Sequence, residues 1–564
     1  MKKHRTRKSS MYKKIFCYLF TFSFFLWGGF YEAISALYSI CGIIFIFWQI
    51  KKTGKLKLPT GKAFYCLCLL LICMIFSVFF AVDPGLAVLG FIKFFPLSLF
   101  VVVAYQLEAA QRDDCIQLLP GVASVMVLLS TVLYFTTLKD YYFTAERMGG
   151  PLQYPNVFAL VMLLAIMVLM DKELLGNREL IQVVICTAGI LMSGSRSIFL
   201  LFVMYLLYVF IWKKPMRKWV AALTGSIVLL AVLGGIILGH VQNFARFSTA
   251  YTHTSTFWGR LLYYQDALEI VKDHPFGLGY KGYYFIQGSY ASGNYVTMFV
   301  HNELLQTILD FGILAGVLLI IMVIISFASK RLTFNKKKML AVCVMHGLFD
   351  FDLQFIAIDF VILLLMDFGE ARTVGVSVKV KVVVFLLLIA SIYTMVFLGL
   401  GAMGKNNVAL KLYPWLTFAE LNQISEETVR ENKERIADHI LMRNEYCSAV
   451  YRMKSALSAE TGKLESMIYY AGKSIELDKY NAENYELYIE GLSRALEKAV
   501  QTGNTTEIDY YLKAIISVER QIQDTEQSSS LLAFKIKDSP KIILQEQYLT
   551  YIEKMKQIQK QREV

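Results

Sequence analysis

Long apolar runs, separated by short polar segments, fill roughly the first 400 residues of the chain. A helix of about 20 apolar residues is long enough to cross the roughly 30 Å of hydrocarbon in a bilayer. The runs predict membrane-spanning helices near residues 15–30, 32–50, 63–81, 86–107, 116–136, 155–170, 180–194, 197–212, 218–239, 302–328, 339–351, 354–369 and 381–401. We therefore expect an all-α, polytopic transmembrane bundle of about 13 spans.

Basic residues gather in the short segments between these runs. The clusters lie at 2–8, 51–57, 213–218 and 330–338. Because short, positively charged loops stay in the cytoplasm, alternating spans place five connections outside, together with everything after about 402. Those connections are 82–85, 137–154, 195–196, 240–301 and 352–353. The formal net charge of +13 thus reflects topology in a lipid bilayer, and it does not point to a nucleic-acid partner.

The composition changes near residue 402, which divides the chain into two predicted domains. Residues 1–401 form the membrane domain, and its external loop 240–301 is longer than a connection requires, which is typical of functional loops. Residues 402–564 are more polar and carry amphipathic helical patterns. The stretch Ser474–Asn481 resembles a tetratricopeptide-repeat junction, although Lys479 stands where that motif usually has proline. We expect extracytoplasmic helical hairpins that are dispensable for the membrane fold and available to an envelope protein partner.

Three arginines and one histidine, Arg147, Arg196, Arg260 and His301, stand out on the predicted outer face. Any of these arginines could be an interfacial anchor that reaches toward lipid headgroups. Arg196 fits that explanation less well, because it lies in a short turn among glycine and serine, where an external arginine is disfavoured. Forked guanidinium groups suit phosphate oxygens. His301 opens a membrane helix, where it can be an interfacial histidine or a group that takes up a proton near neutral pH.

No metal site is expected from the sequence. The histidines lack ligand spacing, and His301 and Glu303 point in different directions on a helix. Asp350 and Asp352 would share a divalent cation only in an extended turn, so we interpret them as acidic residues at a helix end. Cys447 is the only one of nine cysteines in the predicted external portion, which predicts no external disulfide within one chain.

Five segments together resemble the O-antigen ligase and polymerase family of membrane glycosyltransferases, which share a GT-C-type helical fold. They are GGPLQYPNVFAL, SGSRSIFLLFVMYLLYV, GRLLYYQDALEIVKDHPFGLGYKGY, HNELLQTILDFGILAG and HGLFDFDLQF. The resemblance covers roughly residues 10–400 and is strongest in 145–320. A His-Asn pair, nine residues and then Gly312 fit the ligase signature, whereas Ala315 departs from the Gly, Thr or Tyr usually found there.

The resemblance implies roles for individual residues. Arg196 and Arg260 correspond to the family's diphosphate-binding arginines, and His301 corresponds to its proposed catalytic base. Further candidates for contact with the substrate are Arg147, Tyr280 and Asn302. The aromatic residues of the loop, Tyr280 among them, could stack on sugars or form an interfacial belt.

The implied reaction is transfer of a glycan from a polyprenyl diphosphate to an acceptor hydroxyl. It would occur at the outer face of a bacterial cytoplasmic membrane, with inversion of the sugar and without a metal or cofactor. A repeat-unit polymerase of the same family is the alternative enzyme. A solute or inorganic-carbon transporter is an alternative of another class, and it should carry ionisable groups near the bilayer midplane, where Lys93 is the main example.

Overall fold

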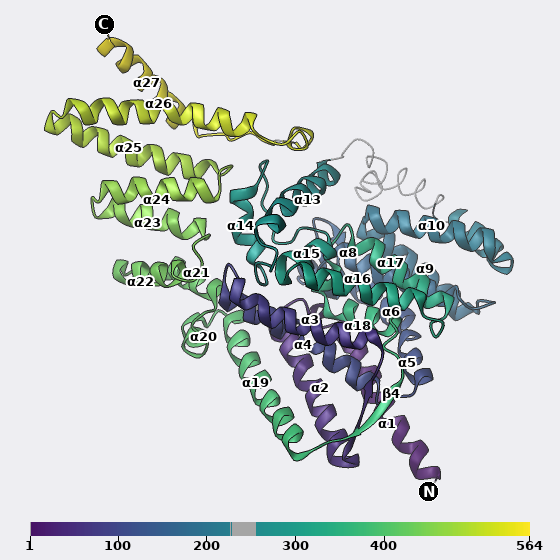
Figure 1. The fold of residues 1–564 in the computed structure, drawn as a ribbon. Coiled ribbons are helices and arrows are strands. Elements are labelled where there is room, and N and C mark those ends of the chain that lie inside the picture. Colours follow the sequence, from purple (N-terminus) through teal and green to yellow (C-terminus); the bar gives the residue numbers. More distant parts are fainter. Residues whose placement is uncertain (1, 226, 228–254, 538, 564) are drawn as a thin grey trace.

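The computed structural model describes residues 2–225, 227, 255–537 and 539–563. It is a helical bundle from which a stack of further helices leads to the C-terminus (Figure 1). Two small antiparallel sheets accompany the helices: β1 (Lys55–Pro59) pairs with β4 (Ala371–Gly375), and β2 (Phe143–Thr144) pairs with β3 (Arg147–Met148). The fold is therefore mostly helical, as the apolar pattern predicts.

The predicted spans that lie within the described residues coincide with helices. The bundle contains α1 (Lys2–Ser23), α2 (Glu32–Thr53), α3 (Lys62–Phe76), α4 (Pro84–Ala104), α5 (Ala109–Ile116), α6 (Leu119–Leu133), α7 (Lys139–Tyr142), α8 (Pro155–Leu169), α9 (Asn177–Ser193), α10 (Arg196–Trp212), α13 (Ser255–Asp273), α14 (Gly282–Tyr290), α15 (Glu303–Phe311), α16 (Ile313–Ala328), α17 (Phe334–Gly347), α18 (Ile356–Leu365) and α19 (Val378–Ala402). Short 3-10 helices are η1 (Trp27–Gly29), η2 (Ser77–Phe80), η3 (Gly150–Leu152), η4 (Lys214–Met216) and η5 (Asp352–Gln354). Most of the predicted span 218–239 and the loop residues 240–254 lie outside the described residues.

Five helical segments among the described residues are long and apolar enough to cross a membrane. They are α2, α3 with η2, α4, α5 with α6, and α19. A sixth is formed if α10 and the helix from Lys214 to Gly225, which meet at 115°, belong to one span. The apolar helices α8, α16 and α18 are shorter. These helices support a multi-pass membrane protein, and the count of 13 spans stays a prediction.

The continuous helix predicted at 302–328 is instead two helices, α15 and α16, which meet at Gly312. Gly312 has φ +89° and ψ 167°, a conformation that is essentially restricted to glycine. The segment 275–279 packs against this break: Leu278 N–H donates to Leu309 O at 2.6 Å, and Ile313 N–H donates to Pro275 O at 3.0 Å. Hydropathy does not reveal such a break, because mostly apolar residues continue on both sides of Gly312 and the average stays high enough for a continuous span.

Loops that the charge pattern assigns to the cytoplasm contact one another. The β1–β4 pairing joins the connection after α2 to the connection after α18. The Lys336 ammonium contacts the Asp113 carboxylate, which joins the first turn of α17 to α5. Each of these contacts links segments on the same predicted side.

Loops assigned to the outer side also contact one another. Lys281 Nζ lies 2.7 Å from Glu32 Oε1, and the Thr417 hydroxyl donates to Asp83 Oδ2 at 2.6 Å. The second contact joins the short loop before α4 to the segment after α19. The packing and the alternating topology are therefore mutually consistent.

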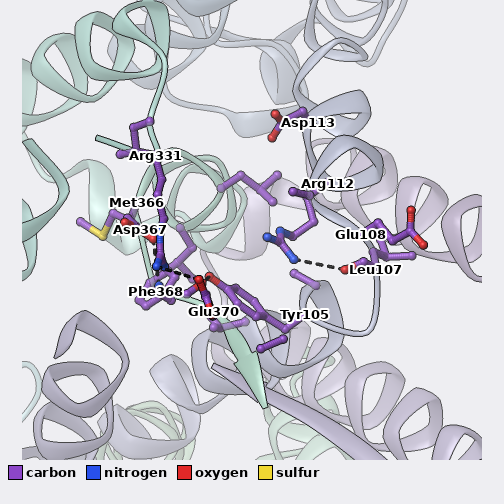
Figure 2. Close-up of a pocket in the computed structure, with 18 of the residues that line it drawn as sticks. Tyr105, Leu107, Glu108, Arg112, Asp113, Arg331, Met366, Asp367, Phe368 and Glu370 are labelled. Carbon is purple, nitrogen blue, oxygen red and sulfur yellow. Dashed lines mark hydrogen bonds and ion pairs between the residues drawn. The ribbon is translucent and has the colours of Figure 1, made fainter. Parts of the chain in front are cut away.

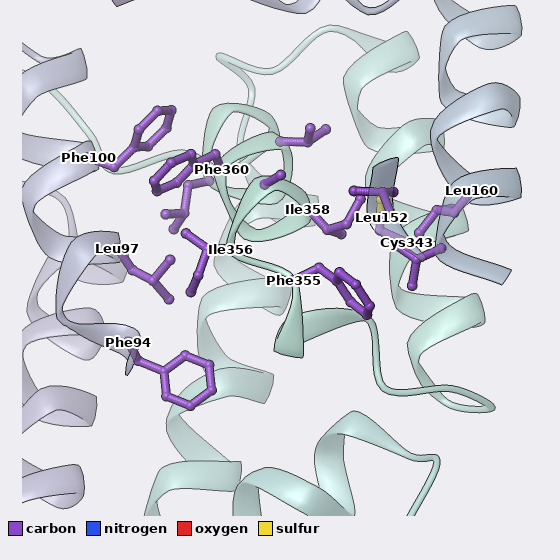
Figure 3. Packing of buried hydrophobic residues seen from close by; sticks show 14 of the residues in the cluster. Phe94, Leu97, Phe100, Leu152, Leu160, Cys343, Phe355, Ile356, Ile358 and Phe360 are labelled. Carbon is purple, nitrogen blue, oxygen red and sulfur yellow. The ribbon is translucent and has the colours of Figure 1, made fainter. Parts of the chain in front are cut away.

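The core of the bundle surrounds α8, whose residues are all buried. Helix α18 packs against α4 and α17, with Phe360 beside Phe100 (Figure 3). The rings of Phe100 and Phe360 are stacked at 4.0 Å between centroids. Because α8 begins at Pro155 on the outer side, this packing fixes the position of the residues just before and after its first turn.

The C-terminal portion is a series of consecutively packed helices. They are α20 (Asn406–Leu412), α21 (Thr417–Glu426), α22 (Arg430–Leu441), α23 (Ser448–Glu460), α24 (Leu464–Leu477), α25 (Ala482–Thr502), α26 (Thr505–Gln527), η6 (Ala533–Lys535) and α27 (Glu546–Glu563). The hydrophobic cluster of the bundle continues into them as far as Val450, and a second cluster forms around α25 and α26. This shared core argues against the expectation that residues 402–564 are dispensable for the membrane fold. A tetratricopeptide identity and an extracytoplasmic location stay predictions.

Candidate active site

A fully buried carboxylate, Asp350, lies where segments from four parts of the predicted outer face meet. Its Oδ1 accepts hydrogen bonds from the Tyr154 hydroxyl at 2.7 Å and from Phe351 N–H at 3.0 Å. Its Oδ2 accepts from Asn156 Nδ2 at 2.6 Å and lies 3.6 Å from Arg260 Nη2. A buried charge needs such compensation, because an unpaired one is very costly.

His301 faces the same carboxylate. Its Nδ1 lies 3.4 Å from Asp350 Oδ1, and its side chain is 21% exposed. With the ring proton on Nδ1, the imidazole donates toward Asp350 and leaves Nε2 free to accept a proton. The backbone of His301 has φ +56°, which is unusual for a residue other than glycine, so surrounding contacts must hold it there.

Tyr264 and Asn302 provide those contacts. The Tyr264 hydroxyl lies 2.7 Å from His301 O and 3.0 Å from Leu348 O, and these two carbonyl oxygens share its single proton. Asn302 caps α15 by accepting from Leu305 N–H at 3.0 Å, and its Nδ2 donates to Leu348 O at 3.1 Å. Asn302 therefore has a structural role next to His301, besides the substrate contact expected from the sequence.

Arg147 extends the site along the start of α8. Its Nη2 donates to Asn156 Oδ1 at 2.6 Å, and its Nε donates to Ser193 O at 2.8 Å. Asn156 in turn donates to Asp350. The structure thus brings Arg147 to the same group of residues as Arg260 and His301.

Arg196 is the first residue of α10 and is half-buried. It follows Gly194, whose φ of +59° ends α9 in a left-handed turn. The next residue, Ser197, has its hydroxyl 3.2 Å from Nε2 of His346, and that nitrogen lies 3.9 Å from Asp350 Oδ2. The turn that carries Arg196 therefore borders the Asp350 group.

Tyr280 lies elsewhere. It is buried, and its hydroxyl donates to Glu32 Oε1 at 2.9 Å, in a separate polar group that includes Lys281. A glycine packs against it: a Cβ at Gly90 would stand 2.3 Å from Tyr280 Cβ. Tyr280 is thus the one predicted substrate-contact residue that the structure does not bring to the Asp350 group.

Asp350 and Asp352 do not form a shared cation site. Asp352 Oδ2 pairs with His346 Nδ1 at 2.7 Å, while the oxygens of Asp350 accept from Tyr154 and Asn156. Within the residues that the structure describes, no group of three or more His, Cys, Asp or Glu side chains could hold a metal ion.

An apolar groove of about 270 Å³ lies beside the site, between α16, α17 and α18. Leu319, Ile320, Val323 and Ile324 line it along α16. Its lining also includes Leu348, whose carbonyl oxygen accepts from Tyr264 and Asn302. The groove therefore joins the polar site to the apolar surface of the bundle.

A second cavity, of about 580 Å³, lies on the predicted cytoplasmic side (Figure 2). Its charged residues are balanced, since Arg331 pairs with Glu370 at 3.1 Å and Lys336 pairs with Asp113. Arg112 donates to Leu107 O at 3.1 Å and stacks on Tyr105. This cavity holds none of the outer-face residues.

Sequence reasoning did not identify Asp350 and His346 as site residues. The sequence pattern indicates an acidic residue at a helix end for Asp350, and it places His346 inside the predicted span 339–351. Both belong to HGLFDFDLQF, a segment already noted for its resemblance. The available signal was a histidine and two carboxylates at the outer end of an apolar run, where ionisable groups need partners.

Comparison with known proteins finds that part of this site is similar to a known family. The family model described as O-Antigen ligase matches residues 181–320. That match includes Arg196, Arg260 and His301. No curated protein and no solved structure matches the chain significantly. The match supports the predicted family over residues 181–320, and members of that family are membrane enzymes that transfer glycans.

Proposed function

We propose that the protein transfers a glycan from a polyprenyl diphosphate to an acceptor hydroxyl, because residues 181–320 match the O-antigen ligase family model. The reaction takes place at the outer face of the cytoplasmic membrane of a bacterium. One observation supports this most strongly: Arg260 and His301, far apart in sequence, meet at a single buried carboxylate, Asp350.

The arginines stabilise the leaving group. When the bond between the anomeric carbon and the phosphate oxygen breaks, negative charge grows on the departing diphosphate. Guanidinium groups held in place before the reaction stabilise that charge without having to reorganise. The closest approach of Arg260 to Asp350 is 3.6 Å, from Nη2 to Oδ2, and this contact orients a guanidinium group whose five N–H donors suit phosphate oxygens.

His301 acts as the base. The acceptor oxygen attacks the anomeric carbon from the face opposite the phosphate and gives its proton to Nε2 of His301, so the anomeric centre inverts. Asp350 supports the imidazole from its Nδ1 side, as an orienting carboxylate does in other base-activated nucleophile systems. The 3.4 Å separation is long for a hydrogen bond, and such contacts commonly shorten when substrate binds.

The apolar groove receives the polyprenyl chain. It lies beside the polar site and is lined mainly by apolar side chains, together with Glu303 and Asp352, so it suits a hydrocarbon tail whose diphosphate reaches the arginines. Val323→Trp should fill the groove and raise the KM for a long-chain donor about tenfold or more, with little change for a short-chain donor. Ile321→Trp is the matched control, because Ile321 is a neighbour outside the groove lining. Equal effects of the two variants would refute the assignment.

A polymerase of repeat units would use the same donor chemistry with a second lipid-linked glycan as acceptor, and it remains the alternative enzyme. The transporter alternative has less support from the structure. Lys93, its main candidate, donates to Gly29 O at 2.6 Å and to Phe30 O, and so stabilises the turn between α1 and α2.

The test is mass spectrometry of lipid-linked and envelope glycans in cells with and without the protein. Loss of the protein should cause a polyprenyl diphosphate glycan to accumulate and one envelope glycan to disappear. Arg196→Lys and Arg260→Lys should restore the product poorly, because lysine lacks the forked geometry. Unchanged glycan profiles in the deletion strain, or full activity of both lysine variants, would contradict the proposal. The donor that accumulates in the deletion strain then serves as substrate for assays with purified protein. A polymerase would lengthen the lipid-linked glycan, whereas a ligase would move it to a different acceptor without lengthening it.

A further inference from the structure

Helix α13 has two opposite faces with different partners. At about 100° per residue, Arg260 and Tyr264 lie on one face, and Trp258, Leu262 and Gln265 lie on the other. The first face contacts Asp350, His301 and Leu348 through the ion pair and hydrogen bonds described above.

The second face is covered by the bracing segment, defined here as residues 530–537 and 539–541, which follows α26. Lys535 Nζ lies 3.9 Å from the ring centroid of Trp258. The Ser530 hydroxyl donates to Gln265 Oε1 at 2.9 Å. The N-terminal half of α13, which carries Arg260, therefore lies between the Asp350 group and the end of the C-terminal stack (Figure 1).

The bracing segment also holds the loop that leads to His301. Ser530 N–H donates to Ser292 O at 2.9 Å, and Asn294 Nδ2 donates to Lys541 O at 3.1 Å. The loop packs closely against the segment, since a Cβ built at Gly293 would lie 2.7 Å from Cβ of the buried Ala533. The positions of Arg260 and His301, the two groups of the proposed reaction, thus both depend on the bracing segment.

Asp266 joins the two supported elements. This buried residue of α13 accepts from Ser292 N–H at 2.9 Å and from the Tyr295 hydroxyl at 2.8 Å. Burial raises the pKa of the Asp266 carboxyl, while the Ser292 hydrogen bonds oppose that rise. The link keeps α13 and the loop before His301 in one relative position.

We infer that the bracing segment is a positioning element for Arg260 and His301, so that the C-terminal stack is a structural part of the active site. This inference rests on the proposed function for its catalytic consequence. Its structural part, the coupling of the segment to α13 and to the loop before His301, can be tested without any substrate.

The experiment uses the full-length protein in lipid nanodiscs and two substitutions on opposite sides of one contact. Ala533→Arg introduces a bulky charge from the bracing segment, and Gly293→Ala introduces a methyl group from the loop. Leu531→Arg is the matched control, because Leu531 belongs to the same segment and is 83% exposed. Gly293→Ala is mild enough to provide a result if Ala533→Arg does not fold.

Hydrogen–deuterium exchange of peptides covering 257–264 and 296–303 is the first measurement. Both contact variants should raise exchange there, and Leu531→Arg should not. Transfer kinetics with lipid-linked glycan extracted from the host are the second measurement. Here the contact variants should lower kcat about tenfold or more with an unchanged KM for the donor. Displacing the groups that act in the reaction slows the chemical step much more than it weakens binding of the donor.

The outcomes separate the inference from the proposed function. Unchanged exchange in both peptides, or equal changes in the Leu531→Arg control, would overturn the coupling whatever the activity. Increased exchange with wild-type kcat would overturn the positioning role. Increased exchange in a protein whose wild type transfers no glycan would support the coupling and refute the proposed function instead.

Discussion

Replacing Asp350 with asparagine is the sharpest perturbation of the site. The substitution keeps the size of the side chain but turns one of its two acceptor oxygens into a donor. An amide nitrogen at the Oδ2 position would face Asn156 Nδ2 at 2.6 Å and also Arg260. An amide nitrogen at the Oδ1 position would face the Phe351 N–H at 3.0 Å. Either orientation places two donors against each other.

The magnitude follows from these contacts. A hydrogen bond to a charged group contributes about 1.5–3 kcal/mol, and the substitution removes at least one and leaves Arg260 without its carboxylate. A total loss of about 3 kcal/mol at the transition state corresponds to a rate decrease of about 10²-fold. Asp350→Asn should therefore retain about one hundredth of wild-type kcat/KM.

The assay is transfer of extracted lipid-linked glycan by purified protein in nanodiscs, with the melting temperature measured in parallel. Asp367→Asn is the matched control. Asp367 also accepts two hydrogen bonds, from the Ser329 hydroxyl and from Gly369 N–H, but it lies on the predicted cytoplasmic side. Turnover of Asp350→Asn within about threefold of wild type would refute the role of this carboxylate. An equally inactive Asp367→Asn would show that the loss reflects general destabilisation.

Three further predictions concern the base, the topology and the broken helix. His301→Gln should lose about 10²–10⁴-fold in rate, nearly as much as His301→Ala, while both still bind the donor; near-normal turnover of the glutamine variant would remove His301 from the mechanism. In a protein without other cysteines, Met442→Cys should react with an impermeant thiol reagent in intact cells and Lys214→Cys only after lysis; the reverse would refute the topology. Gly312→Ala should lower the melting temperature, because its Cβ would stand 2.8 Å from the backbone carbonyl carbon of Phe276. Gly399→Ala is the control and should not lower it, since there is open space around Gly399. Equal melting temperatures of the two variants would show that the break tolerates a side chain.

The topology experiment illustrates what the sequence could not reveal. Cys447, the external cysteine, would be the natural label, but it is 3% exposed. Its pKa is raised to about 11 by burial, which disfavours the reactive thiolate further. An amphipathic pattern predicts a helix and its inner face, but it does not specify which neighbouring helix covers a given residue.

Much of the site could be predicted from the sequence, because several of its residues lie in short local motifs. Arg260 and His301 lie in motifs that resemble a known family, and hydropathy with charge places both at one membrane face. Asp350 was not accessible in this way, since its partners Tyr154 and Asn156 lie nearly two hundred residues earlier. A local Asp-x-Asp pattern indicates a helix end or a metal site, and it carries no information about distant donors.

The long outer loop is best understood as scaffold, because its described part holds the two proposed catalytic groups, Arg260 and His301, in one relative position. From the middle of α13, Tyr264 contacts the backbone of His301, which has a left-handed conformation. After the C-terminal end of α13, the segment 275–279 bonds to the break after α15, with Gly279 N–H donating to Asp310 O at 3.0 Å. Electrostatic catalysis requires charged groups that are already in place when charge develops. A lid that ordered itself only with substrate would spend binding energy on that ordering. The described part of this loop is already ordered by its hydrogen bonds and by its contacts with the C-terminal stack, so that cost is met during folding.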